Sequence, residues 1–328
     1  MAKSNKLNVG IIGSGKIGTD LLIKIQRSHF LHCDLFVGRD SESPGIQAAR
    51  SMGVNISTKS LDAFREHSSP LDLVFDATSA NDHKQHAQYF LEAGIKAIDL
   101  TPAKVGRFCI PSIDAEAVTH EANINMVTCG GQASIPVVHT LSKVYPNISH
   151  LEVESHLAAD SVGPATLANI DEYYSTTASA ISAYTCIQNV SVKLQVEQSA
   201  WKPDMLTIIR AYTNDNDVEK LYEPLMSRVL EVRKQVPGYH IVGTPTYRDG
   251  AIEILVSVRG QGDWIPSHAG NLDIINCAAI AIAESYAQHV GVQPGHSQGQ
   301  GNGEPIQGTF GSLLGFLGKG NKSLPKTA

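Results

Sequence analysis

The chain has 328 residues, 42% of them hydrophobic and 18% charged, and a formal net charge of −6. This length predicts two domains, and the composition is that of an ordinary globular enzyme. No basic cluster and no apolar run long enough to span a bilayer occur, which argues against a nucleic-acid partner and against a membrane protein.

The cysteines and the N-terminal residues indicate in which cellular compartment the protein works. Five cysteines occur, an odd number, widely spaced and without a C-x-x-C pair. This argues against a disulfide framework or a zinc site, so we predict no metal. The first six residues lead into a predicted strand without a signal-peptide core, and we expect a cytoplasmic location.

Residues 1–130 alternate between short apolar runs and amphipathic segments. Repeated βα units of this kind predict a parallel sheet with right-handed crossovers. Strands are expected at residues 7–12, 31–37, 71–75, 96–100 and 124–128, and helices at 16–27, 47–52, 61–67 and 83–93.

The segment Gly13-Ser14-Gly15-Lys16-Ile17-Gly18 follows the first strand and opens the first helix. A G-x-G-x-x-G turn in this position is typical of a Rossmann-type dinucleotide site. Its glycines allow a tight turn, close approach of a pyrophosphate and close packing of helix on strand. A glycine-rich turn without a ligand is the weaker interpretation, because position, strand and helix all agree.

An acidic residue about 20 positions further on would bind the adenosine ribose. Asp40 ends the second strand and favours NAD, whereas Arg39 and Ser41 beside it could accept the 2′-phosphate of NADP. We predict NAD, with NADP as the alternative.

Cys129 is the most informative residue of the chain. An apolar strand precedes it, Gly130 and Gly131 follow, and we expect a helix to begin near Pro136, since proline suits a first helical turn. Helix N–H groups and the positive end of the helix dipole would favour the reactive thiolate. The other four cysteines are expected to be small buried hydrophobes.

The pattern changes after residue 148, where long helices separate several strands. This predicts an α+β domain at residues 131–269. Strands are expected at 151–157, 190–196, 206–212, 239–242 and 251–258, and helices at 166–185 and 217–236. An Ala- and Ile-rich helix at 271–290 is expected to return to the first domain, which would comprise residues 1–130 and 270–291. Gly, Gln, Ser and Pro then dominate, so residues 292–328 are expected to be a flexible tail.

Several segments resemble the acylating acetaldehyde dehydrogenases over roughly residues 7–290. They are residues 10–21, 75–80, 98–103, 126–136, Gly163-Pro164, 168–172 and 269–274. The resemblance implies oxidation of a short aldehyde to acyl-CoA, with NAD as cofactor and coenzyme A as cosubstrate. It also implies a 4-hydroxy-2-oxoacid aldolase as partner and, with the strand-rich second domain, a homodimer.

The resemblance also implies roles for individual residues. Cys129 would be the nucleophile, and Ser14, Gly15, Lys16 and Ile17 would contact the cofactor phosphates. The nicotinamide side would be formed by Ser161, Gly163, Pro164 and Thr166, and Asn271 would touch the cofactor from the last helix.

A mechanism follows from these roles. The Cys129 thiolate adds to the carbonyl, N–H groups near Gly130 and Gly131 hold the oxyanion, and a thioester forms that coenzyme A cleaves. His268 is the candidate acid–base group. His83 and His86 are three residues apart on a predicted helix, where we expect a surface face.

The second domain departs from the family pattern. Thr207-Ile208 stand where the family carries an Arg-Asp pair, and Asp160 and His268 are also unusual. We therefore expect retained chemistry with a changed acyl substrate or aldolase partnership. Two alternatives remain: a cysteine-dependent dehydrogenase of a semialdehyde or of a carrier-bound acyl group, and a cofactor-binding subunit without turnover.

Overall fold

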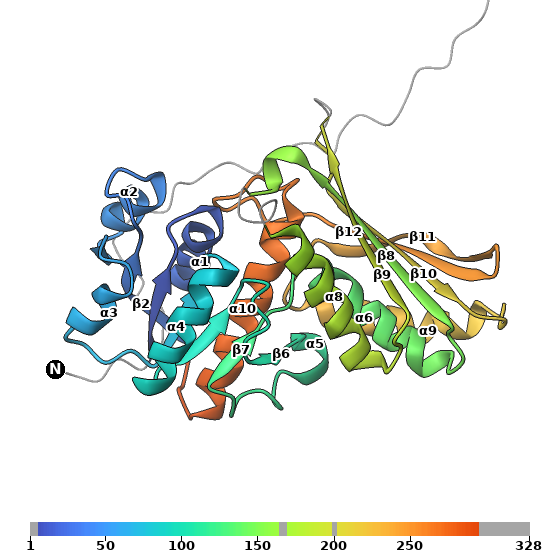
Figure 1. Cartoon of the computed structure of the whole chain (residues 1–328), viewed down its shortest axis with the longest axis horizontal. Coiled ribbons are helices and arrows are strands. Elements are labelled where there is room, and N and C mark those ends of the chain that lie inside the picture. The colour runs from blue at the N-terminus through green and yellow to red at the C-terminus, as the bar shows by residue number, and fades with distance from the viewer. Residues whose placement is uncertain (1–5, 164–168, 199–201, 295–328) are drawn as a thin grey trace, which may run out of the picture. The chain divides into compact units, whose positions relative to one another are not determined.

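A computed structural model describes residues 6–163, 169–198 and 202–294. Two sheets organise this part of the chain (Figure 1). The helices are α1 (Lys16–Arg27), α2 (Pro44–Ser51), α3 (Asp62–Glu66), α4 (Ala80–Glu92), α5 (Pro111–Asp114), α6 (Cys129–Val144), α8 (Ile170–Thr185), α9 (Glu219–Arg233) and α10 (Gly270–His289). None of these helices is long and apolar enough to cross a membrane.

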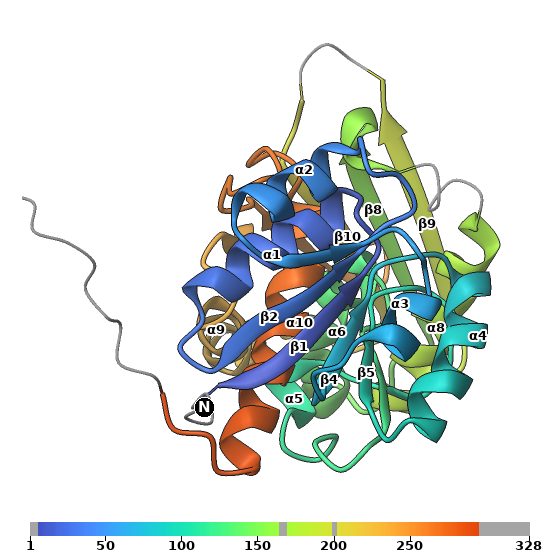
Figure 2. The same cartoon turned by 90° about the vertical axis from the view of Figure 1, so that its left-hand side faces the viewer.

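The first sheet is parallel and has seven strands in the order β3-β2-β1-β4-β5-β7-β6. Strands β2 and β3 extend the sheet on one side of β1, and β4, β5, β7 and β6 on the other, so the strand order reverses between β1 and β4. Ligands of such sheets bind at the carboxyl ends of the strands at this point. The predicted Rossmann-type sheet is confirmed (Figure 2). Its strands are β1 (Leu7–Ile12), β2 (Leu31–Val37), β3 (Asn55–Ser57), β4 (Leu73–Asp76), β5 (Lys96–Asp99), β6 (Arg107–Phe108) and β7 (Asn123–Asn125).

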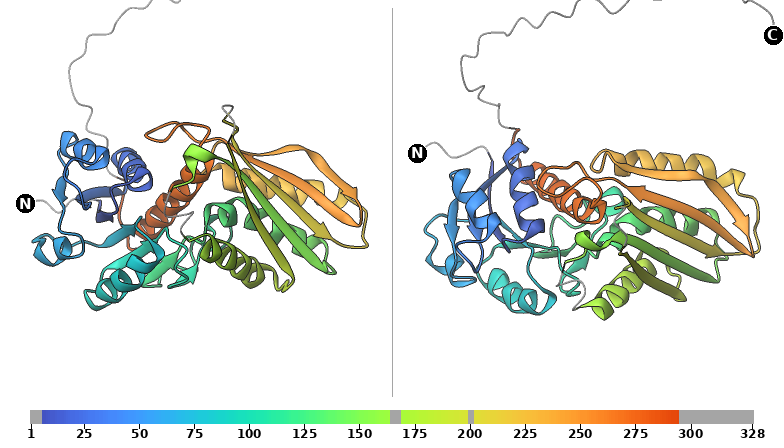
Figure 3. Two further views of the ribbon diagram at one scale, coloured as in Figure 1. Left: turned by 45° about the horizontal axis from the view of Figure 1, so that its top comes forward. Right: turned by 90° about the horizontal axis from the view of Figure 1, so that it is seen from above.

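The second sheet is mixed, in the order β11-β12-β10-β8-β9, with β8 and β9 parallel and the other pairs antiparallel. Burial alternates along β8 and β10, which is the pattern of a sheet with one covered face. Helices α6, α8 and α9 lie on that face, as predicted for an α+β layer (Figure 3). The strands are β8 (His150–Ala158), β9 (Val190–Glu197), β10 (Met205–Tyr212), β11 (Tyr239–Arg248) and β12 (Ala251–Val258).

Helix α10 follows the second sheet in sequence but packs with the first. Ile275, Ile282 and Ala283 belong to the same buried cluster as Val9 and Ile11 of β1. Its contacts with α1 and α6 place it between the two sheets (Figures 1 and 3). The domain limits given above stay a prediction.

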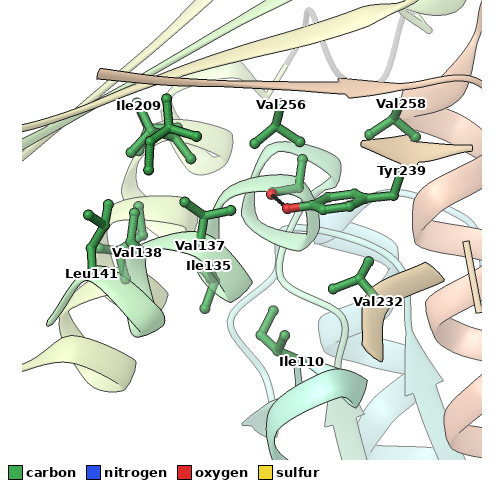
Figure 4. Packing of buried hydrophobic residues seen from close by; sticks show 14 of the residues in the cluster. Ile110, Ile135, Val137, Val138, Leu141, Ile209, Val232, Tyr239, Val256 and Val258 are labelled. Atoms are coloured by element: carbon green, nitrogen blue, oxygen red, sulfur yellow. Dashed lines mark hydrogen bonds between the residues drawn. The ribbon is translucent and has the colours of Figure 1, made fainter. Parts of the chain in front are cut away.

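Helix α6 is the centre of the second core. Its apolar residues Val137, Val138 and Leu141 face the second sheet (Figure 4). Tyr239 is fully buried at the same contact, and its hydroxyl donates to the carbonyl of Ala133 at 2.7 Å. The start of α6 is therefore held rigidly against the sheet.

The expected start of this helix near Pro136 is wrong. Helix α6 begins at Cys129, and the Thr128 hydroxyl caps it by accepting from the N–H of Gly131 at 2.9 Å. Gly130 and Gly131 form the first turn because larger residues would not fit: a Cβ on Gly131 would lie 2.6 Å from Val127 Cγ1. Pro136 lies within the helix, where buried packing compensates for one lost hydrogen bond.

Several smaller expectations differ from the structure. The short elements β3, β6 and α5 were not predicted, since two to four residues give no periodic signal. Cys186 is exposed, not buried, because it ends α8 in a left-handed conformation (φ 63°).

Candidate active site

The backbone around Gly13, Gly15 and Gly18 shows why each of these positions is a glycine. Gly13 has a φ of +112°, and a Cβ there would lie 2.5 Å from the carbonyl oxygen of Ala77. A Cβ on Gly18 would lie 1.8 Å from the carbonyl oxygen of Gly13, so helix and strand can touch only with glycine there. A Cβ on Gly15 would meet nothing within 4 Å. The open space over Gly15 is where a ligand can approach the backbone.

A pocket lies over this turn, which we call the nucleotide pocket. Its walls are the turn, the end of β2 and the start of α4, and they include Gly13, Ser14, Gly15, Arg39 and Asp40. The Asp40 side chain is exposed, and its Oδ1 accepts from the N–H of Glu42 at 2.9 Å. Asp40 is thus held at the rim of the nucleotide pocket, and its role as ribose ligand stays a prediction.

A second pocket surrounds Cys129, which we call the thiol pocket. It is lined by residues of both domains, among them Ile17, Cys129 and Asn271. Thr78 and Ser79 line both pockets, so the two adjoin at the end of β4. The structure therefore brings the predicted nucleophile and most of the predicted cofactor residues to the same region.

Cys129 is the first residue of α6. The backbone N–H groups of Cys129 and Gly130 interact with its sulfur, whereas that of Gly131 is used by the cap. Burial nevertheless raises the pKa of the Cys129 thiol to about 11, against the lowering effect of Tyr173 and these N–H groups. The expected preference for thiolate is therefore wrong for the free protein, because desolvation outweighs the helix terminus.

This pKa predicts how the thiol reacts. Since the thiol is protonated at neutral pH, alkylation of Cys129 by iodoacetamide should rise about tenfold per pH unit between pH 7 and 9. Mass spectrometry of the Cys129 peptide, without cofactor or substrate, measures this rate. A plateau below pH 8 would contradict the burial argument.

The remaining predicted cofactor residues lie where the two domains meet. Lys16 Nζ donates to the carbonyl of Asp160 at 2.6 Å, and Asn271 Nδ2 donates to that of Ser161 at 3.0 Å. His268 Nε2 lies 2.9 Å from Asp160 Oδ1 and is not among the residues that line the thiol pocket. The acid–base role of His268 stays a prediction.

Gly163 ends the described segment after β8, and a Cβ there would meet nothing within 4 Å. Pro164 and Thr166 lie outside the described residues, as does the predicted tail beyond residue 294.

Two histidines expected on a surface are buried under the nucleotide pocket. The Nδ1 atoms of His83 and His86 lie 2.9 and 2.8 Å from Asp76 Oδ2, at the end of β4. Burial raises the pKa of Asp76, but these hydrogen bonds outweigh it and bring the pKa to about 2. The two histidines therefore stabilise the carboxyl end of β4, where the Thr78 hydroxyl also donates to Asp76. Neither this cluster nor any other group of three His, Cys, Asp or Glu side chains within residues 6–163, 169–198 and 202–294 is arranged to hold a metal ion.

Sequence reasoning gave no role to several polar residues of the thiol pocket, among them Thr101, Asn169 and Tyr173. Thr101 follows β5, Asn169 precedes α8, and Tyr173 lies on α8. Thr101 Oγ1 and Asn271 Oδ1 are buried without a hydrogen-bond partner among the described residues. Thr101 and Asn169 belong to segments that resemble the family, but no motif gives them or Tyr173 a role, because only the fold brings β5 and α8 to Cys129.

Comparison with known proteins defines the class first. Residues 8–123 match the family model of the semialdehyde dehydrogenase NAD-binding domain. A solved structure of aspartate semialdehyde dehydrogenase II from Vibrio cholerae shares the fold, with a TM-score of 0.61 at 15% identity over 86% of this chain and 99% of that one. The chain thus carries an NAD-binding domain of the semialdehyde dehydrogenase type.

The family follows from the second half and from curated relatives. Residues 129–266 match the family model described as "Prokaryotic acetaldehyde dehydrogenase, dimerisation". Acetaldehyde dehydrogenases of Spirochaeta aurantia and Pectobacterium atrosepticum are 48% and 44% identical to the chain; each match covers 86% of this chain, and 95% and 96% of the relatives. The chain belongs to the acetaldehyde dehydrogenase family.

Proposed function

We propose that this enzyme oxidises a short aldehyde to an acyl-CoA, reversibly, with NAD as hydride acceptor and Cys129 as nucleophile. One observation carries the proposal: the pocket around Cys129 adjoins the pocket over the glycine turn through the shared residues Thr78 and Ser79. A thiol beside a dinucleotide cleft suits oxidation through a covalent thioester.

The described residues fit a dinucleotide. The space over Gly15 is open at a helix N-terminus, which suits a pyrophosphate. The unpartnered Asn271 Oδ1 and Thr101 Oγ1 in the thiol pocket can bind a carboxamide. When bound, NAD supplies a hydride acceptor beside Cys129.

The residues around Cys129 support each covalent step. The sulfur adds to the aldehyde carbon, and the N–H groups of Cys129 and Gly130 stabilise the oxyanion that forms. Loss of hydride leaves a thioester on Cys129. The thiol of coenzyme A then displaces the Cys129 sulfur and releases the acyl-CoA.

We predict that Asp40 sets the cofactor preference. Replacing Asp40 by Ala removes a charged partner of the 2′-hydroxyl and leaves Arg39 at the same rim, so KM for NAD should rise about tenfold or more while use of NADP improves. Steady-state kinetics with both cofactors measure this. Arg39→Ala is the matched control and should leave KM for NAD within about twofold; an unchanged cofactor ratio in Asp40→Ala would contradict the assignment.

We propose a homodimer formed through the second domain. The family model that matches this domain is one of dimerisation, and the side of the sheet away from α6 carries half-buried Glu152, Glu154, Arg210 and Glu253. Light scattering at micromolar concentration should give twice the mass of one chain; a monomer would contradict it.

The proposal also includes a compartment and a partner protein. All five cysteines are free, which suits work in the reducing cytoplasm. Partnership with a 4-hydroxy-2-oxoacid aldolase rests on the family resemblance.

Assays over a series of aldehydes test the proposed reaction. Reduction of NAD should require coenzyme A for sustained turnover and should favour short unbranched aldehydes. If phosphate replaced coenzyme A, or if a semialdehyde were clearly preferred, the alternative dehydrogenase functions would stand instead.

A further inference from the structure

A tyrosine hydroxyl lies buried beside Cys129 without a regular hydrogen bond. Tyr173, on α8, is 3% exposed and lines the thiol pocket. Its Oη interacts with Cys129, Ser155 and the backbone of Gly130, yet it has no hydrogen bond of regular geometry to any residue within the described ranges. Leaving a buried polar group unsatisfied costs stability, so such a group points to a role in the site.

Two contacts fix the position of Tyr173. Thr128, the cap of α6, lies 2.7 Å from Thr177 of α8 through their hydroxyls, and Thr177 donates to the carbonyl of Tyr173 at 2.8 Å. A Cβ on Gly130 would lie 2.1 Å from Tyr173 Oη, so only glycine leaves room for this hydroxyl. The start of α6 is therefore shaped around the Tyr173 side chain.

Further hydroxyls continue away from the thiol. Ser155 of β8 and Thr207 of β10 are directly paired across the second sheet, on its helix-covered face. Their hydroxyl oxygens are 3.1 Å apart. The half-buried Cys129 and the buried Tyr173, Ser155 and Thr207 thus form one row.

We propose that Tyr173 is a catalytic residue that donates a hydrogen bond to the ionised sulfur of Cys129, with Ser155 and Thr207 positioning it. In this row the Thr207 hydroxyl donates to Ser155, Ser155 donates to Tyr173, and Tyr173 donates to sulfur. The Ser155 and Tyr173 oxygens each accept one bond and donate one, so the row has a direction and ends on the nucleophile.

The electrostatics agree with this direction. Burial raises the pKa of Tyr173 well above its usual value, and a charge on Cys129 raises it further, so the phenol stays a donor. The groups that act on the Cys129 thiol are Tyr173 and the N–H groups of Gly130 and Cys129, with no charged side chain of the described residues among them. The hydroxyl is therefore the side-chain donor that can stabilise the thiolate.

The test is the pH profile of Cys129 alkylation by iodoacetamide in the full-length protein. Tyr173→Phe should lower the alkylation rate 10- to 100-fold at pH 8 and move the profile to higher pH, since a hydrogen bond to a charged group is lost. Its thermal midpoint should change by no more than about 2 °C, because the Tyr173 hydroxyl makes only contacts of irregular geometry with the described residues. A rate within twofold of the unchanged protein would overturn the proposal.

Tyr184→Phe is the matched control on the same helix. The Tyr184 hydroxyl donates to Asp114 at 2.7 Å and accepts from the N–H of Ile110 at 3.1 Å, so its loss should lower stability but leave alkylation of Cys129 unchanged. Equal slowing in both variants would overturn the proposal. Ser155→Ala should give a smaller shift in the same direction and provides the test should Tyr173→Phe not fold; there, an unshifted profile would overturn the proposal.

The proposal depends on the proposed function only in calling Tyr173 catalytic, because the hydrogen bond to Cys129 can be tested without turnover. Alkylation needs no aldehyde or coenzyme A, so a protein without dehydrogenase turnover whose Tyr173→Phe profile still shifts would refute the function and keep the hydrogen bond. In an active enzyme, Tyr173→Phe should also lower kcat about tenfold with little change in the KM for NAD. An unaltered kcat would overturn the catalytic role.

Discussion

Replacing Cys129 by Ser should lower kcat for coenzyme A-dependent aldehyde oxidation roughly 10⁴-fold or more, since the covalent route then has no adequate nucleophile. Serine is nearly isosteric and Cys129 is the first residue of a capped helix, so the fold and the nucleotide pocket should be preserved. Binding of NAD should remain within about twofold. Initial rates of NAD reduction and a binding titration measure the two effects.

Cys186→Ser is the matched control for this variant. Cys186 is exposed at the end of α8, and surface substitutions of this kind rarely have large effects. It should leave kcat within about twofold. If Cys129→Ser retained more than a tenth of the activity, the thioester mechanism would have to be abandoned.

Gly15→Ala should separate cofactor binding from folding. A Cβ on Gly15 meets no protein atom within 4 Å, and its φ of −76° suits alanine, so the fold should be kept. The new methyl would instead stand where the pyrophosphate must approach the backbone. Affinity for NAD should fall about 10- to 100-fold in a titration, with an unchanged thermal midpoint in the absence of NAD.

Gly18→Ala is the contrasting variant within the same motif. Its Cβ would lie 1.8 Å from the carbonyl oxygen of Gly13, so helix α1 would have to move away from β1. We expect a loss of about 3 kcal/mol of stability, at the upper end for overpacking. Unchanged NAD affinity in Gly15→Ala would show that the pyrophosphate does not bind over this turn.

The parts of the site that local sequence encodes were predictable. The glycine turn follows from residue spacing, since Gly13 has a positive φ and Gly18 packs against the nearby backbone of Gly13. Asp40 follows in the same way from its place after β2. The parallel sheet was predictable from short, continuously apolar runs that alternate with helical segments, because strands buried on both faces are hydrophobic throughout.

Long-range packing sets the rest. Proline is common in the first turn of a helix, so Pro136 predicted the wrong start for α6. The true cap is Thr128, whose hydroxyl also contacts Thr177 of α8. His83 and His86 looked like a surface pair because their shared partner, Asp76, belongs to a separate strand. In the sequence, Thr207 only differed from the residue usual in the family. Its position opposite Ser155 follows from the register of the sheet.

Intact-mass analysis of the protein after mixing with acetyl-CoA tests the central claim most directly. The account predicts a covalent acetyl adduct, mapped by peptide sequencing to Cys129, which disappears on adding coenzyme A and is absent from Cys129→Ser. An active enzyme that forms no adduct, or that carries it on another cysteine, would contradict the account.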